Sequence, residues 1–212
     1  TSVANGTIDA ITASGSLVLT VSNCTFTANT LGSVFANPTG TAAHNVTVQN
    51  CTSSGTGAGQ ADIGIGANTS GIVGVNLTNN TVNGSGTALR GIDFFSQGTT
   101  QLTARILNNT ISGCTGEGLF VLASGTSINK MRFEGNRTTG NALNNGWNNA
   151  TSTGAIRAVY KNNTSDRFNL SGSGGTSFQI EELANFNTTS ANTGNLNATA
   201  TQDVPAGSLG IP

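Results

Sequence analysis

Charged and aromatic residues are scarce in this chain of 212 residues. Only 8% of the residues are Asp, Glu, Lys or Arg and 5% are aromatic, whereas 29 are glycine. Any core must therefore be narrow and built from small aliphatic side chains. The formal net charge of −1 gives no reason to expect a nucleic-acid partner. The chain has no run of 18 apolar residues, so it predicts no membrane span.

Histidine and cysteine are almost absent as well. The single histidine, His44, comes just before an expected strand, and we expect it at the surface or in a turn. The three cysteines, Cys24, Cys51 and Cys114, lack the paired spacing of a zinc site. No GxSxG sequence is present to suggest a nucleophilic serine. The sequence therefore predicts no metal site and no cofactor.

What the chain does contain is a short polar phrase that returns at a fixed period. NCT occurs at residues 23 and 50, NNT occurs at 79, 108 and 162, and GNRT occurs at 135. The first residues of successive phrases are 27, 29, 29, 27 and 27 positions apart. A constant period of this length is typical of architectures in which each repeat stacks on the next.

The residues before each phrase alternate between apolar and polar. We call the first residue of each phrase the anchor: Asn23, Asn50, Asn79, Asn108, Gly135 and Asn162. The positions two before the anchor are all apolar: Val21, Val48, Leu77, Ile106, Phe133 and Tyr160. The positions four before it are apolar too: Leu19, Val46, Val75, Ala104, Met131 and Ala158. Alternation with period two predicts a strand with one buried face in every repeat.

A second strand is expected 11 to 13 residues after the anchor. It is seen as VFA from Val34, IGIG from Ile63, IDFF from Ile92 and LFVL from Leu119, with room for a third strand in each repeat. The intervening turns are too short for helices, and the period is too short for a propeller blade. The best fit is a parallel β-helix of about 27 to 29 residues per coil, spanning residues 1–186. Residues 187–212 leave the pattern, and we expect a cap or an inter-subunit tail there.

The position after the anchor predicts a structural ladder at one corner, formed by Cys24, Cys51, Asn80, Asn109, Asn136 and Asn163. Stacked asparagine amides can hydrogen-bond to their neighbours about 4.8 Å away, and asparagine tolerates the left-handed backbone of a sharp corner. Two arrangements stay open for Cys24 and Cys51, a disulfide or two stacked buried thiols. We expect Cys114 to be unpaired.

The coil pattern resembles that of right-handed parallel β-helix proteins of the pectin-lyase-like group. The C-terminal run NNTSDRFNLSGSGGTSFQIEEL, followed by NTGN and DVPAG, is similar to the ends of large secreted bacterial β-helix repeat proteins. The resemblance implies an all-β, right-handed parallel β-helix. It also implies an extracellular or cell-surface location. Enzymes of this fold carry clustered carboxylates on an outer strand face, whereas the bacterial repeat proteins imply no activity.

Acidic residues give no catalytic cluster. Only Asp93 falls clearly within a second-type strand, where it points outward with Gly64 and Phe120 as its column neighbours. Glycoside hydrolysis requires a second carboxyl group within about 5 to 10 Å, and none is visible on an adjacent coil. The sequence therefore predicts that the protein is not an enzyme.

Basic residues are concentrated in one part of the chain. Residues 105 to 167 hold seven of the eight Lys and Arg residues and three acids, a net charge of 7 − 3 = +4. Stacking predicts a basic patch made of Arg105, Lys130, Arg132, Arg157 and Lys161. An acidic polysaccharide or an acidic neighbouring subunit fits such a patch. The alternative is a solvated face, partly neutralised by Glu134 beside Lys161.

Several repeats contain Asn-X-Thr, the acceptor sequence for N-glycosylation. The anchors are the better candidate acceptors: Asn23, Asn50, Asn79, Asn108 and Asn162. The ladder positions are poor candidates, since they point inward. A threonine column two positions after the anchor raises an ice-binding alternative, although it is interrupted by Arg137 and expected at a corner.

Taken together, these features favour a non-enzymatic extracellular structural or adhesive β-solenoid, either a filament subunit or a segment of a cell-surface glycoprotein. Open strand edges at its two ends predict head-to-tail self-association. The alternative is a carbohydrate-active or carbohydrate-binding β-helix module, similar to polysaccharide lyases and hydrolases.

Overall fold

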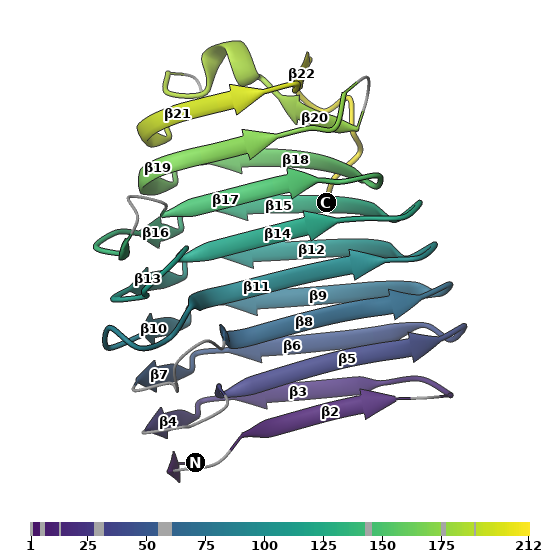
Figure 1. Ribbon diagram of the computed structural model, residues 1–212, viewed down its shortest axis with the longest axis vertical. Helices are drawn as coiled ribbons and strands as arrows, with labels where there is room; N and C mark the ends of the chain where they lie inside the picture. Colours follow the sequence, from purple (N-terminus) through teal and green to yellow (C-terminus); the bar gives the residue numbers. More distant parts are fainter. Residues whose placement is uncertain are drawn as a thin grey trace.

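The chain winds into a solenoid of about seven coils whose strands form three layers (Figure 1). This arrangement is seen in a computed structural model that describes residues 2–4, 7–12, 14–27, 32–54, 61–142, 146–174, 177–188 and 190–212. All strand pairs are parallel. We call the three strand layers the front sheet, the rear sheet and the short-strand sheet, as they lie in Figure 1.

The rear sheet contains the strands that end at the anchors. Its members are β3 (Val18–Ser22), β6 (His44–Gln49), β9 (Ile72–Thr78), β12 (Gln101–Leu107), β15 (Ile128–Glu134), β18 (Ala155–Lys161), β20 (Phe178–Glu181) and β22 (Gln202–Val204). Val21 pairs with Val48, Val48 with Leu77, and so on up to Tyr160. This register confirms the two predicted apolar columns. The column that runs from Val21 to Tyr160 is buried in every coil.

The front sheet contains the second predicted strands. Its members are β2 (Ile8–Thr12), β5 (Val34–Gly40), β8 (Ala61–Thr69), β11 (Arg90–Gln97), β14 (Leu119–Ala123), β17 (Trp147–Thr151), the second half of β19 (Thr164–Ser171) and β21 (Thr193–Thr199). The third strand of each coil is short. These strands are β1 (Ser2–Ala4), β4 (Thr25–Thr27), β7 (Thr52–Ser54), β10 (Thr81–Asn83), β13 (Thr110–Ser112), β16 (Arg137–Thr138) and the first half of β19.

The solenoid is right-handed. In Figure 1 the front strands run from left to right, the rear strands return from right to left, and the chain climbs from the N-terminus toward β22. The all-β, right-handed parallel β-helix predicted from the sequence is therefore confirmed, with roughly 27 residues per coil.

The upper part of the core is aromatic. Phe133 stacks on Tyr160 with ring centroids 4.9 Å apart, and Trp147 lies edge-on to Phe133 at the same distance. Asn149 meets the polar atoms of this cluster: its Oδ1 accepts from Trp147 Nε1 at 3.2 Å, and its Nδ2 donates to the Tyr160 hydroxyl. Burial raises the pKa of the Tyr160 phenol far above its usual value. Trp147 and Tyr160 thus fill the upper core with their polar atoms hydrogen-bonded.

Residues 193–204 of the C-terminal segment 187–212 continue the solenoid instead of leaving it. Strand β21 pairs with β19 and β22 pairs with β20, so both layers gain a strand beyond residue 186. The sequence pattern hides this coil because its anchor is Ala191, which adopts a left-handed φ of 50° where the other coils have Asn or Gly. Just before it, the short 3-10 helix η2 (Leu183–Asn185) is followed by Phe186, whose buried ring packs 5.0 Å from that of Phe168. Whether the segment acts as a cap or as a connector stays a prediction.

Candidate functional site

At the corner where a rear strand ends at its anchor, two consecutive residues have different roles: the anchor makes the turn, and the residue after it is the ladder position. Asn23, Asn50, Asn79, Asn108 and Asn162 have φ between 53° and 55°, and Gly135 takes the same corner at 66°. The left-handed backbone, expected at the ladder position, belongs to the anchor instead. The five anchor asparagines are exposed to solvent, so they remain the candidate glycosylation acceptors.

The ladder position carries a continuous chain of buried amide hydrogen bonds. Asn109 is representative: its Nδ2 donates to Asn136 Oδ1 and to the Leu77 carbonyl, both at 3.0 Å. From Cys51 to Asn163, the backbone N–H of each ladder residue donates to the Oδ1 of the ladder asparagine in the next coil. The predicted ladder of Asn80, Asn109, Asn136 and Asn163 is therefore confirmed, and Asn192 extends it by one coil.

Cys24 and Cys51 occupy the first two ladder positions as free thiols. Each sulfur lies 3.3 Å from the carbonyl oxygen two residues earlier, which is the carbonyl that the Asn109 amide also contacts in its own coil. Cys114 is free and buried, and its N–H donates to Asn141 Oδ1 at 3.1 Å. The partly exposed Cys24 and the buried Cys51 thus occupy the first two ladder positions as small thiols.

We expect a thiol-reactive dye to titrate three thiols in denaturant but only one, Cys24, in the native protein near pH 8. Cys24 is partly exposed, whereas Cys51 and Cys114 are buried. Burial raises the pKa of both buried thiols, that of Cys114 to about 12, so the reactive thiolate is suppressed. A Cys24→Ser variant should abolish the native reaction. A count of one thiol in denaturant would instead demonstrate a Cys24–Cys51 disulfide.

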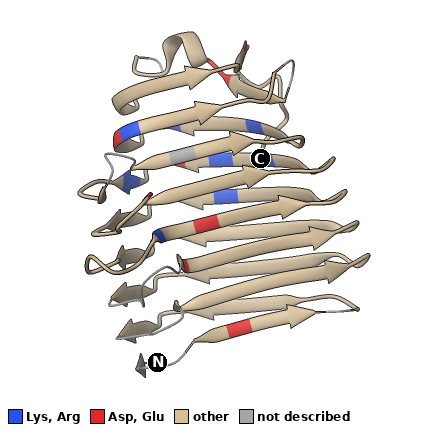
Figure 2. Cartoon of the chain, viewed as in Figure 1, with Lys and Arg blue, Asp and Glu red and all other residues tan. Residues whose placement is uncertain are grey.

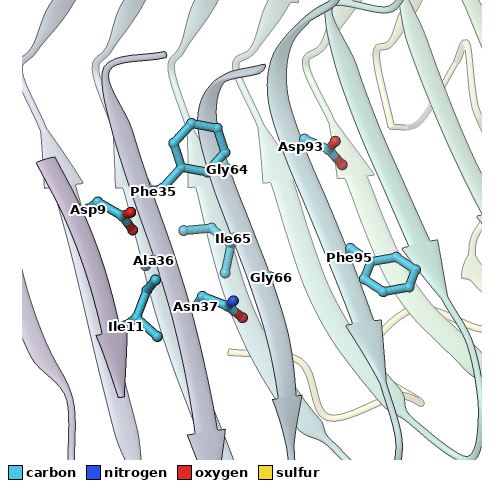
Figure 3. Close-up of a pocket in the computed structure, with 10 residues that line it drawn as sticks. All are labelled: Asp9, Ile11, Phe35, Ala36, Asn37, Gly64, Ile65, Gly66, Asp93 and Phe95. Atoms are coloured by element: carbon cyan, nitrogen blue, oxygen red, sulfur yellow. The ribbon is translucent and has the colours of Figure 1, made fainter. Parts of the chain in front are cut away.

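A groove of about 360 Å³ opens on the outer face of the front sheet, across β2, β5, β8 and β11 (Figure 3). It exists because β8 presents Gly64 and Gly66 outward, where neighbouring coils present side chains. A Cβ on Gly64 would lie 2.5 Å from the Phe35 ring, which leans over the bare strand. Asp9 lies on one side of the ring and Asp93 on the other, with Asn37 and the half-exposed Phe95 beyond.

Asp93 faces outward, as predicted, with Gly64 and Phe120 as its column neighbours. Arg90 pairs with Asp93 at 2.9 Å and with Glu117 at 3.1 Å, and its guanidinium lies 3.7 Å from the centre of the Phe120 ring. Burial raises the pKa of the Asp93 carboxyl, against the opposing effect of Arg90. This ion pair gives Asp93 a fixed position and a neutralising partner.

Two other acids lie on front strands, which sequence reasoning missed. Asp9 occupies the outward column of Asp93, but Phe35 and Gly64 stand between them. Three coil spacings of about 4.8 Å put the two strands roughly 14 Å apart, too far for a catalytic carboxyl pair. Asp62 is fully buried in β8, where its carboxylate accepts hydrogen bonds from Ser33 and Ser53.

His44 was predicted to lie at the surface or in a turn, but it is buried at the start of β6. Its Nδ1 accepts a hydrogen bond from the Leu17 N–H at 3.1 Å. The prediction failed because the flanking turn residues suggested exposure, whereas the alternation that buries Val46 and Val48 also buries His44.

The predicted basic patch is assembled as the repeat implied. Arg105 stacks on Arg132, and Lys130 stacks on Arg157, on the outer face of the rear sheet. Figure 2 shows the basic residues gathered in the upper coils, and the chain has none before Arg90. Glu134 lies beside Lys161 in the register, but its carboxylate binds Arg132 at 2.7 Å instead.

The threonine column lies on the short strands rather than at a corner. Thr25, Thr52, Thr81 and Thr110 stack in register, beside a second outward column of mixed composition: Thr27, Ser54, Asn83 and Ser112. This second column lacks the regularity that a lattice-matching surface requires.

Comparison of the chain with protein-family models, with curated protein sequences and with solved structures gave no match. In the part of the chain that the structure describes, no group of three or more His, Cys, Asp or Glu side chains is placed to hold a metal ion. No helix there is long and apolar enough to cross a membrane. Function must therefore be argued from the surfaces described above.

Proposed function

We propose that this chain is a non-enzymatic structural or adhesive β-solenoid that acts outside the cell, as a filament subunit or as a segment of a cell-surface protein. The observation that carries the proposal is that the repeated positions of the coils have structural roles. Buried columns, an asparagine ladder and left-handed corners recur in successive coils, while the two outward acids of the front sheet are separated by three coils. The resemblance to secreted bacterial β-helix proteins supports the extracellular location.

End-to-end association is part of this proposal. Strands β2 and β3 form one edge of the solenoid and have neighbours on one side only. They expose Ile11 and Val18, at 65% and 74%. Strands with unpaired N–H and C=O groups are natural templates for another parallel strand. Electron microscopy of the native material should show fibres with this chain as the repeating unit. Only monomers at high concentration, with no fibres, would overturn the filament form.

Carbohydrate binding by the front groove is a second candidate, and one observation favours it. The groove brings together the Phe35 ring, the Asp9 carboxylate and the Asn37 amide on its lining. An aromatic ring can pack against the C–H face of a sugar while carboxylate and amide groups hydrogen-bond to its hydroxyls.

We expect Phe35→Ala and Asp9→Asn each to weaken binding of neutral oligosaccharides about tenfold, since each removes one of the few specific contacts. Isothermal titration against a polysaccharide panel, with and without calcium, measures this. Asn197→Ala is the matched control, because Asn197 lies in the same outward column but on β21, far along the axis. Equal weakening by the control would exclude the groove. Release of reducing or unsaturated products would overturn the non-enzymatic assignment.

A further inference from the structure

The rear sheet carries cations that the protein itself does not neutralise. Arg132 is held by both Nε and Nη2 against Glu134, at 2.9 and 2.7 Å. In the described part of the chain, no ion pair engages Arg105, Lys130, Arg157 or Lys161. These four groups lie on the outer face of three consecutive coils, β12, β15 and β18. The rear sheet therefore carries four cations without an ion-pair partner, whereas Arg137 and Arg167 lie away from it, on β16 and β19.

Arg157 supplies a second, independent observation. Its Nε is buried and has no hydrogen-bond partner among the described residues. A buried guanidinium N–H that lacks an acceptor is costly, and an anionic oxygen is the strongest acceptor available to it. Arg157 also stacks directly on Lys130, so two like charges repeat one coil apart. An anion bound beside Arg157 would supply the missing acceptor and offset the repulsion between the two cations.

The surface beside Arg105 is hollowed. Gly74 leaves a gap in the outer face of β9, and a groove of about 240 Å³ there is lined by Asn45, Thr47, Asn76, Thr103 and Arg105. Amide and hydroxyl groups of this kind bind the hydroxyls of a sugar. The groove and the cations lie on successive strands of one sheet, β6 to β18. Together they form a track that runs parallel to the solenoid axis.

We propose that this rear track binds a linear anionic polysaccharide, with Arg105, Lys130 and Arg157 as its main contacts. Arg105 shares an outward column with Arg132, and Lys130 shares the neighbouring column with Arg157. Cations therefore recur on three coils about 4.8 Å apart along the axis, which suits a polymer that carries an anionic group on repeated units. The outward residues of these strands include no aromatic ring, and single-stranded nucleic acids need such rings as stacking platforms. The proposal gives the adhesive role suggested above a partner, and so rests on it.

The experiment measures binding of polygalacturonate and of dextran sulfate, which present carboxylate and sulfate groups respectively, at low and physiological salt. We expect Arg105→Gln and Lys130→Gln each to weaken binding about two- to fivefold. The double variant should weaken it further, and the effect should shrink as salt is raised. Preference for one polymer identifies the anion. Thermal melting checks that each variant is folded, as expected for side chains on the outer face.

Two further variants make the test specific. Arg137→Gln makes the same charge change on β16, away from the rear sheet, and should leave binding unchanged. Glu134→Gln releases Arg132 and should tighten binding. Equal loss in Arg137→Gln would show a general charge effect and overturn the track. So would the absence of any binding by the unaltered chain, or tighter binding of a single-stranded oligonucleotide. Fibres seen by microscopy together with any of these results would refute the partner and leave the structural role standing.

Discussion

An Ile106→Asp variant is expected to be unfolded. Ile106 is fully buried in the rear-sheet column, between Leu77 below and Phe133 above. The substitution removes a large aliphatic side chain and places a carboxylate where no partner exists, at a combined cost of about 5 kcal/mol or more. That loss is comparable to the whole stability of many domains. Circular dichroism and a thermal melt measure it.

Thr103→Asp is the matched control for this column. Thr103 lies on the same strand, three residues earlier, and belongs to the outward-facing set. The charge is then solvated, so we expect a change of stability of about 0.5 kcal/mol or less. A cooperatively folding Ile106→Asp protein with normal stability would show that the strand register is wrong.

An Asn109→Ala variant should lose about 3 kcal/mol or more of unfolding free energy. The Asn109 amide serves two neighbouring coils: its Oδ1 accepts from both nitrogens of Asn80, and its Nδ2 donates to Leu77 O. Truncation leaves these buried groups without partners, and each such group costs about 1 to 3 kcal/mol. Urea denaturation measures the loss.

Asn108→Gly separates the ladder from the corner itself. Asn108 is exposed, and its φ of 55° is a conformation that glycine adopts without strain. Glycine already occupies this corner in the next coil, at Gly135. We expect a change of stability within about 1 kcal/mol. If Asn108→Gly were as damaging as Asn109→Ala, the exposed amides rather than the buried ones would hold the coils together.

The repeat alone was enough to place most of the backbone. Because equivalent residues of a parallel solenoid stack directly, a period of 27 to 29 residues fixes which side chains meet, and the columns from Val21 to Tyr160 and from Arg105 to Arg132 follow from it. The ladder followed too, because only a short amide at a constant offset can serve neighbouring coils. The last coil was missed, since Ala191 breaks the pattern of anchor residues without breaking the period.

The front groove could not be predicted in the same way. Its existence depends on the direction in which the Phe35 ring leans across Gly64, and on how far the bare strand lies below its neighbours. Both depend on how side chains pack between coils, and the period of the repeat does not predict that packing. The burial of Asp62 was missed for the same reason, whereas that of His44 follows from the alternation along β6.

The sequence by itself determined the fold class, the coil length, the strand register and the set of residues that share each column. Only the tertiary structure decided which members of a column interact: Glu134 binds Arg132 and not Lys161, Arg90 neutralises Asp93, and Asp9 lies beyond reach of Asp93. The physical reason is that stacking depends on a period, which is written linearly in the chain. Ion pairing and groove formation instead depend on rotamers and on depth below the surface, and these are fixed only when the coils pack.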